Sequence, residues 1–174
     1  TARVVGLSLL ALACTPSDGP GARQGAVPPP ADSIVLERSI CFGSCPAYRM
    51  RLSNRGEVLF ESRNPEEQGR RTSDTVTAAT FPALISKARS IGFFDLPAEI
   101  AADSVLCHVR ATDHPTVVVT VFAKAQTKRV DDYLGCYETP ERGILPPVVR
   151  LRSFEVEIDS VLRASRWVTP ANRR

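Results

Sequence analysis

Residues 48–61 read Tyr-Arg-Met-Arg-Leu-Ser-Asn-Arg-Gly-Glu-Val-Leu-Phe-Glu and carry the strongest structural signal in the chain. Apolar and polar side chains alternate on both sides of the segment Asn54-Arg55-Gly56, which is the pattern of strands with one buried face. A three-residue loop of this kind lets Gly56 adopt the left-handed conformation of a hairpin bulge. The sequence therefore predicts a β-hairpin with three opposed pairs: Leu52 and Val58, Met50 and Phe60, and the oppositely charged Arg49 and Glu61.

Two helices are predicted downstream of this hairpin. The first is expected to run from about Ala78 or Phe81 to Ile91, where Gly92 ends it. The second opens at the pair Pro146-Pro147 and continues to about Arg163, with an apolar stripe toward the core. Its charged residues are expected to be largely solvated, namely Arg150, Arg152, Glu155, Glu157 and Asp159.

Apolar and β-branched runs predict further strands at residues 34–38, 106–111, 116–123 and 127–133. Residues 63–73 are polar and contain Pro65 and Gly69, so they are expected to form a surface loop. Together these elements predict the α+β class: a mainly antiparallel sheet of about five to six strands with two helices packed on it.

The chain divides into a short N-terminal part and one domain. Residues 34–168 have the length of a single α+β domain, and residues 169–174 are expected to be a C-terminal tail. The formal net charge is +3, and it becomes +2 if Arg3 is removed with a signal peptide. So small an excess of positive charge does not favour a nucleic-acid partner.

Residues 1–13 end in a ten-residue apolar run, Val4 to Ala13, which Cys14 follows directly. The run is half of the ~20 residues that a membrane-spanning helix needs, and it matches the apolar region of a secretory signal peptide. Two cleavage interpretations use the same bond: Ala11-Leu12-Ala13 suits ordinary signal peptidase, and with Cys14 it resembles an imperfect bacterial lipobox. We expect a signal peptide at 1–13 and a lipid on Cys14. Plain secretion and a buried helix of a cytosolic domain are the alternatives.

The next segment supports export. Residues 15–33 contain five prolines and three glycines and almost no large apolar side chains. Such a composition cannot bury enough surface to offset the entropy of ordering the chain, so a disordered tether is expected at residues 14–33. A tether between a lipidated cysteine and a domain is the usual arrangement of a lipoprotein.

Four cysteines remain once Cys14 is assigned to a lipid. An even number in an exported domain indicates two disulfides, with three possible connectivities. Cys107–Cys136 is favoured because these residues flank adjacent predicted strands, and Cys41–Cys45 because both lie in one tight turn around Gly43.

The segment Ile40-Cys41-Phe42-Gly43-Ser44-Cys45-Pro46-Ala47-Tyr48 carries a family resemblance, together with the turn at residues 54–58. The chain resembles a bacterial family of exported proteins classed as a domain of unknown function, the one numbered 6438. Shorter agreements extend the resemblance over nearly all of residues 34–167: Gly92-Phe93-Phe94, Thr112-Asp113-x-Pro115, Asp132-Tyr133-x-Gly135 and Ile158-Asp159. The resemblance implies an envelope or secreted domain, often lipid-anchored, and brings no catalytic residues; its motif positions are Phe42, Gly43, Pro46, Tyr48 and Asp113.

Several residues could carry chemistry, but no catalytic motif is complete. Cys41 and Cys45 could be a redox pair, although three intervening residues are not the two of thioredoxin-like motifs. A hydrolase could use Asp113 and His114, although Asp113 before His114-Pro115 is more typical of a turn. Adjacent Cys107 and His108 would point to opposite faces of a strand, so a zinc site is not predicted, and neither is any cofactor.

Two functional hypotheses follow. The first is a non-catalytic module of the cell envelope, attached to the membrane through a lipid on Cys14. It would bind an envelope protein, a peptide or the cell wall through a sheet edge or a turn. The second is a small exported enzyme, either a hydrolase at Asp113 and His114 or a thiol enzyme at Cys41 and Cys45. A concave pocket that joins Asp113, His114 and Asp132 would favour the enzyme.

Overall fold

The computed structural model describes residues 1, 32–67, 69–124, 126–137 and 145–168. Nearly all of the predicted signal peptide and tether, Cys14 included, lies outside these residues, as does the predicted C-terminal tail. No helix in the described part of the chain is long and apolar enough to cross a membrane.

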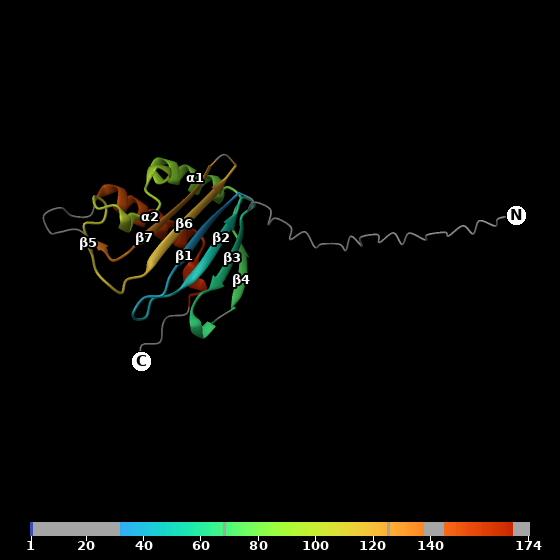
Figure 1. Cartoon of the computed structure of the whole chain (residues 1–174), viewed down its shortest axis with the longest axis horizontal. Coiled ribbons are helices and arrows are strands. Elements are labelled where there is room, and N and C mark those ends of the chain that lie inside the picture. The colour runs from blue at the N-terminus through green and yellow to red at the C-terminus, as the bar shows by residue number, and fades with distance from the viewer. Residues whose placement is uncertain (2–31, 68, 125, 138–144, 169–174) are drawn as a thin grey trace.

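One layer of the fold is a six-stranded antiparallel sheet with the strand order β4-β3-β2-β1-β6-β7 (Figure 1). The short strands β5 and β8 pair with each other in a separate two-stranded ribbon. The bounds of the strands are β1 Ser33–Arg38, β2 Tyr48–Ser53, β3 Glu57–Ser62, β4 Arg71–Thr75, β5 Val109–Arg110, β6 Thr116–Ala123, β7 Gln126–Tyr133 and β8 Cys136–Tyr137.

The predicted hairpin is confirmed as β2 and β3. Leu52 lies opposite Val58 and Met50 opposite Phe60, and Gly56 has a φ of 85° in the turn. Arg49 lies opposite Glu61 as predicted, but its guanidinium is 3.8 Å from the Glu37 carboxylate on β1. The register is therefore right, whereas the charge of Arg49 faces the other neighbouring strand.

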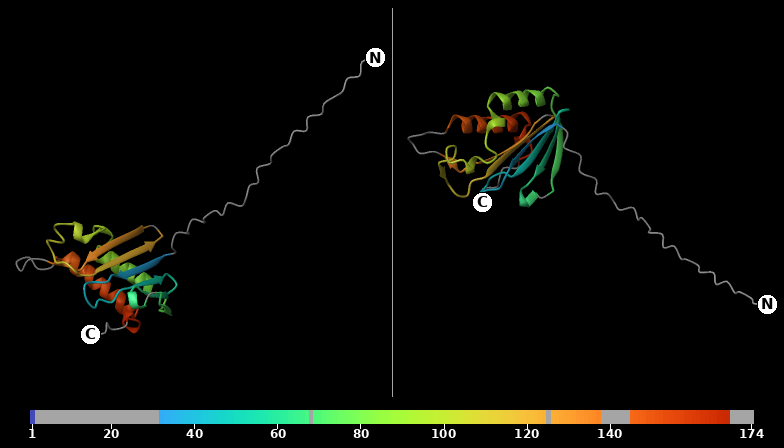
Figure 2. Two further views of the ribbon diagram at one scale, coloured as in Figure 1. Left: turned by 60° about the horizontal axis from the view of Figure 1, so that its bottom comes forward. Right: turned by 45° about the horizontal axis from the view of Figure 1, so that its top comes forward.

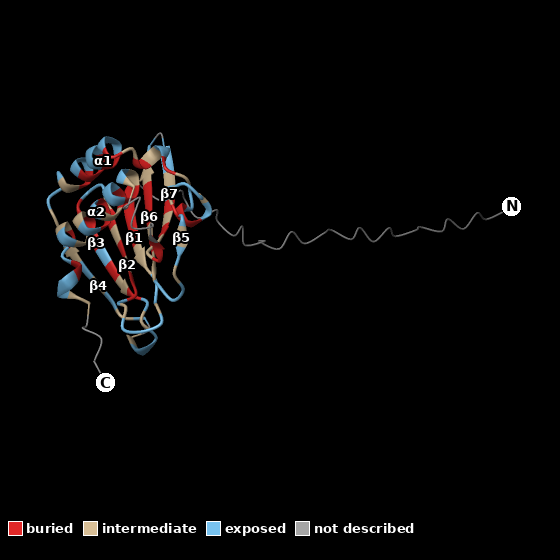
Figure 3. Ribbon diagram, turned by 90° about the vertical axis from the view of Figure 1, so that its left-hand side faces the viewer, coloured by how far each residue is buried: buried red, intermediate tan, exposed pale blue. Residues whose placement is uncertain are grey.

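Two helices form the second layer: α1 (Thr80–Ser90) and α2 (Pro146–Val161). Both lie on the same face of the sheet (Figure 2), and burial is concentrated between the layers (Figure 3). The α+β prediction is confirmed, and both helices begin and end within about two residues of their predicted bounds. Short 3₁₀ turns occur at Pro65–Glu67, Phe93–Asp95, Ile100–Ala102 and Ala164–Arg166.

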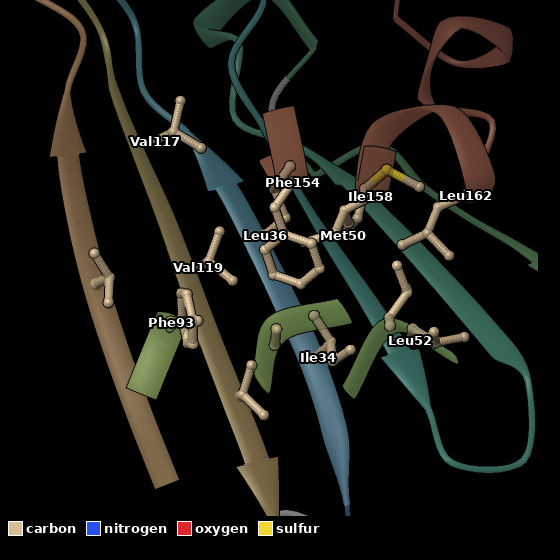
Figure 4. Packing of buried hydrophobic residues seen from close by; sticks show 14 of the residues in the cluster. Ile34, Leu36, Met50, Leu52, Phe93, Val117, Val119, Phe154, Ile158 and Leu162 are labelled. Atoms are coloured by element: carbon tan, nitrogen blue, oxygen red, sulfur yellow. The ribbon is translucent and has the colours of Figure 1, made fainter. Parts of the chain in front are cut away.

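Alternation along the strands explains how the core forms. Every second residue of β1, β2 and β6 points toward the helices, and Leu36, Met50 and Val119 are fully buried there. From α2, Phe154 and Ile158 pack onto these strands (Figure 4). The opposite face of the sheet carries no helix in the described part of the chain, as the views of Figure 2 show.

Two predictions about strands were wrong. Residues 63–73 were expected to be a loop, yet Arg71–Thr75 forms the edge strand β4, paired with β3. Polar residues suffice there because an edge strand needs only backbone hydrogen bonds to one neighbour. Residues 106–111 were expected to be a strand, but only Val109–Arg110 pairs, and its partner is β8.

Candidate functional site

The loop between β1 and β2 is closed by a disulfide between Cys41 and Cys45, whose Cα atoms are 5.5 Å apart. Gly43 at its tip has a φ of 140°, which an L-residue rarely adopts. The Phe42 backbone N–H donates to the carbonyl oxygen of Asp113 over 3.3 Å, so the loop lies against a second turn. We call residues 39–47 the disulfide loop.

Phe42 is the most exposed large apolar residue described in the chain, with 90% of its surface accessible. Ile40, in the same loop, is 58% exposed. Both side chains stand on a short segment that the disulfide and its hydrogen bonds hold. Aromatic side chains, phenylalanine included, are enriched at the cores of protein interfaces, so Phe42 is a candidate anchor for a partner.

An open groove of about 440 Å³ adjoins the disulfide loop. Glu37 and Val118 lie opposite each other in its floor and alternate with core residues, so the groove is on the face of the sheet that faces away from the helices. Its lining residues are Glu37, Arg38, Ser39, Ile40, Ala47, Arg63, Pro65, Thr116, Val118 and Arg129.

Each charged residue of the groove has a partner of opposite charge. Glu37 faces Arg49 at 3.8 Å, Arg63 lies 3.3 Å from Glu61, and Arg129 lies 2.8 Å from Asp131, while Arg38 pairs with Asp159. The groove thus has little unbalanced charge. It suits an uncharged, partly apolar segment better than a strongly charged polymer.

Asp159 of α2 accepts hydrogen bonds from the two residues that flank the disulfide loop, Arg38 and Tyr48. The Arg38 guanidinium, at the end of β1, donates to Asp159 Oδ2 from Nε at 2.8 Å and from Nη2 at 2.6 Å. The Tyr48 hydroxyl, at the start of β2, donates to Asp159 Oδ1 over 2.7 Å. Burial raises the pKa of Tyr48, and the Asp159 carboxylate adds to the rise, so the phenol keeps the proton that it donates.

A second ion pair joins α2 to the other disulfide. Arg152 donates to the fully buried Asp132 of β7 over 2.8 Å, and to the Cys136 carbonyl oxygen over 3.0 Å. Cys136 is bonded to Cys107, with their Cα atoms 5.1 Å apart. Both favoured cysteine pairings therefore occur in the structure.

Glu155 lies between these two ion pairs and is only 2% exposed. Its Oε1 atom has no hydrogen-bond partner among the described residues. Burial raises the pKa of its carboxyl to about 8; the Asp132 carboxylate adds to the rise, and Arg38 and Arg152 oppose it. The prediction that Arg152, Glu155 and Asp159 are largely solvated was wrong, because the side chains of Arg152 and Asp159 are only 23% and 19% exposed.

Asp113 and His114 do not form a pocket with Asp132. Asp113 has a φ of 69° and is exposed, as a turn former would be. The exposed His114 ring makes an edge contact with Tyr133 at 6.5 Å between centroids. Asp132 is fully buried against Arg152, so these three residues offer no shared site for a substrate. No group of three or more potential metal ligands was found in the described part of the chain.

The comparison with protein families gives one result. Residues 32–145 match the family described as "Domain of unknown function (DUF6438)". The chain belongs to this family. No curated protein matches it.

The DUF6438 match covers the disulfide loop, all of the strands and α1, and it ends just before α2. Arg38, Tyr48 and Asp132 thus lie inside the matched range, whereas their partners on α2 lie beyond it. We call the residues of these ion pairs, together with Tyr48 and Glu155, the charged cluster. Within it, Arg38 and Tyr48 are 121 and 111 residues from Asp159 in the sequence. No local pattern in the sequence could have brought them together, and a charged residue beside the apolar stripe of a helix ordinarily faces water.

Proposed function

We propose that this DUF6438 domain is a non-catalytic binding module of the cell envelope, attached to a membrane through a lipid on Cys14. Its binding surface is the disulfide loop together with the adjoining groove. Its partner is an envelope protein that inserts an uncharged, partly apolar segment.

The exposure of Phe42 is the observation that carries this proposal. A phenylalanine that is 90% exposed forgoes the free energy of burial, which is about 2 kcal/mol for a large apolar side chain. Because the loop is already ordered by its disulfide, binding would cost little further conformational entropy. A pre-ordered aromatic anchor of this kind is what protein interfaces use.

The lining of the groove favours an uncharged, partly apolar protein segment over a strongly charged partner. Ile40, Ala47 and Val118 supply apolar surface, and the rim charges are already paired within the domain. A partner would therefore gain affinity from apolar contact and not from a net field. The groove size of about 440 Å³ is suited to a few side chains of a bound segment.

The envelope location is supported by the cysteines. Disulfides persist in oxidising compartments and are rare in the cytosol, and both pairs have bonding geometry here. Assigning Cys14 to a lipid accounts for the fifth cysteine of the chain. The apolar run before Cys14 supplies the export signal that such a location needs.

The test is site-specific photocrosslinking in the native envelope. A photoreactive phenylalanine analogue is placed at position 42 and, as a matched control, at position 156, where Val156 is 63% exposed on α2. We expect one discrete crosslinked protein band from position 42 and none from position 156. Equal labelling from both positions, or no adduct from position 42, would contradict the proposal.

A further inference from the structure

Three charged residues of α2 form one line along the helix. Arg152, Glu155 and Asp159 are spaced by three and four residues, so they share the face that packs on the sheet. The outer two are bonded to different strands: Arg152 to Asp132 on β7, and Asp159 to Arg38 on β1. Glu155 lies between them without an ion pair among the described residues.

The charges of this cluster balance only when Glu155 carries a proton. Two arginines face two aspartates, and each cation is already used by one carboxylate. An ionised Glu155 adds a third negative charge inside the core, where burial makes an unpaired charge costly. Lys87 of α1 does not compensate it, because that ammonium lies 3.7 Å from Glu157. The titratable and charged groups that face Glu155 are Arg38 from β1, Tyr48 from β2 through Asp159, Asp132 from β7, and Arg152 and Asp159 from its own helix.

We propose that proton release from Glu155 loosens the docking of α2 on the sheet and, through Asp159, the attachment of the disulfide loop. Arg38 and Tyr48 flank that loop and both bond to Asp159, four residues along the helix from Glu155. A shift of α2 away from β1 and β2 therefore releases both ends of the loop together. The device does not depend on any partner, so it stands or falls separately from the proposed function.

The direction of the effect follows from the raised pKa of Glu155. In the folded domain its pKa is about 8, above the ordinary value of 4.5. Between these values the folded state holds a proton that the undocked state releases, so docking weakens as pH rises. Undocking that fully solvates Glu155 becomes about tenfold more favourable per pH unit between roughly pH 5 and pH 7.5, and it levels off above about pH 8.

Amide hydrogen exchange of the whole domain tests this. The Ser39 and Phe42 amides are suitable reporters, because they donate to the carbonyl oxygens of Thr116 and Asp113 and so hold the disulfide loop in place. Their protection factors, corrected for intrinsic exchange, should fall about tenfold per pH unit over that range. The Gly56 amide, which bonds to Ser53 at the opposite end of β2, serves as the internal control and should change less.

The matched variants are Glu155→Gln, which cannot ionise, and Glu157→Gln, which removes a half-exposed carboxylate from the same helix. The first should abolish the pH dependence at Ser39 and Phe42, and the second should preserve it. Unchanged pH dependence in Glu155→Gln, or none in the wild type, overturns the proposal. If Glu155→Gln does not fold, the ¹³C resonance of the Glu155 carboxyl in the wild type decides: a midpoint near pH 4.5 overturns the proposal, and one above pH 7 supports it.

Discussion

Asp132 shows how much one residue of the cluster depends on its neighbour. Its carboxylate is fully buried, and Arg152 both neutralises it and donates to the Cys136 carbonyl oxygen. Replacing Arg152 by methionine leaves Asp132 buried without a cation. We expect the free energy of unfolding to fall by about 3–5 kcal/mol at pH 7, as is usual when one member of a buried ion pair is removed.

Urea unfolding of Arg152→Met against Arg129→Met checks this expectation. Arg129 makes a similar 2.8 Å ion pair with Asp131, but its side chain is 53% exposed. Its replacement should change the free energy of unfolding by about 1 kcal/mol or less. Equal losses for the two variants would show that the burial of Asp132 does not govern the stability of its pair.

Gly56 is held in a position that no larger residue fits. Its φ is 85°, and a Cβ built there would lie 2.3 Å from the Val76 carbonyl oxygen. Gly69 has nearly the same φ, 84°, but its Cβ would meet no described atom within 4 Å. Gly56→Ala should therefore cost about 3 kcal/mol or more, and Gly69→Ala only about 1–2 kcal/mol for the left-handed backbone alone.

Thermal or urea unfolding of both alanine variants measures the difference. Because Gly56 and Gly69 have nearly the same φ, the difference between the two losses of stability gives the cost of the contact between the added Cβ and the Val76 carbonyl oxygen. A Gly56→Ala variant as stable as Gly69→Ala would mean that the turn can move away from Val76 at little cost.

Gly56 and Glu155 differ in how far their surroundings can be predicted from the sequence. Gly56 could be predicted because a hairpin bulge places a local demand on one backbone conformation. The burial of Glu155 could not be predicted, because the sequence of α2 does not indicate that Arg38 and Asp132 lie near it. Both belong to strands that are far away in the sequence. Burial of a carboxyl group is a property of the packed layers and not of the helix pattern.

Among the elements, the two disulfides brace loops of different size. Cys107 and Cys136 are 29 residues apart, and Cys41 and Cys45 only four. From loop-closure entropy, replacing both cysteines by alanine should cost about 3.5 kcal/mol for the first pair and about 2 kcal/mol for the second.

Denaturant unfolding of the two double-alanine variants tests this ranking. The Cys41/Cys45 variant should also lose protection of the Phe42 amide while the Gly56 amide is unaffected, because its disulfide orders only the loop. A larger loss of stability from the Cys41/Cys45 pair than from Cys107/Cys136 would contradict the entropic account.

The elements that can be predicted from the sequence are those with a strong apolar period. The hairpin and both helices have such a pattern, and all three were located correctly. The edge strand β4 reads Arg-Thr-Ser-Asp-Thr and contributes no buried residue, so it carries no hydrophobic signal. Residues 106–111 carry an apolar signal, but Cys107 is held by its disulfide, and only two residues pair with β8.

At the scale of the whole molecule, the two faces of the sheet have different surroundings. The helices bury one face of the sheet, and the charged cluster beneath α2 fixes the disulfide loop at one end of it. The opposite face, with its groove, is left for a partner under the proposal made above. Both disulfides belong to this arrangement, and disulfides persist mainly in oxidising compartments, which is in keeping with the proposed envelope location.

The proposed envelope location is tested most directly by mass spectrometry. The protein is purified from its native membranes and digested without reductant. Our account predicts a first residue of Cys14 that carries lipid, with Cys41 linked to Cys45 and Cys107 linked to Cys136. A chain that retains residues 1–13 and has free thiols at Cys41 and Cys45 would contradict it.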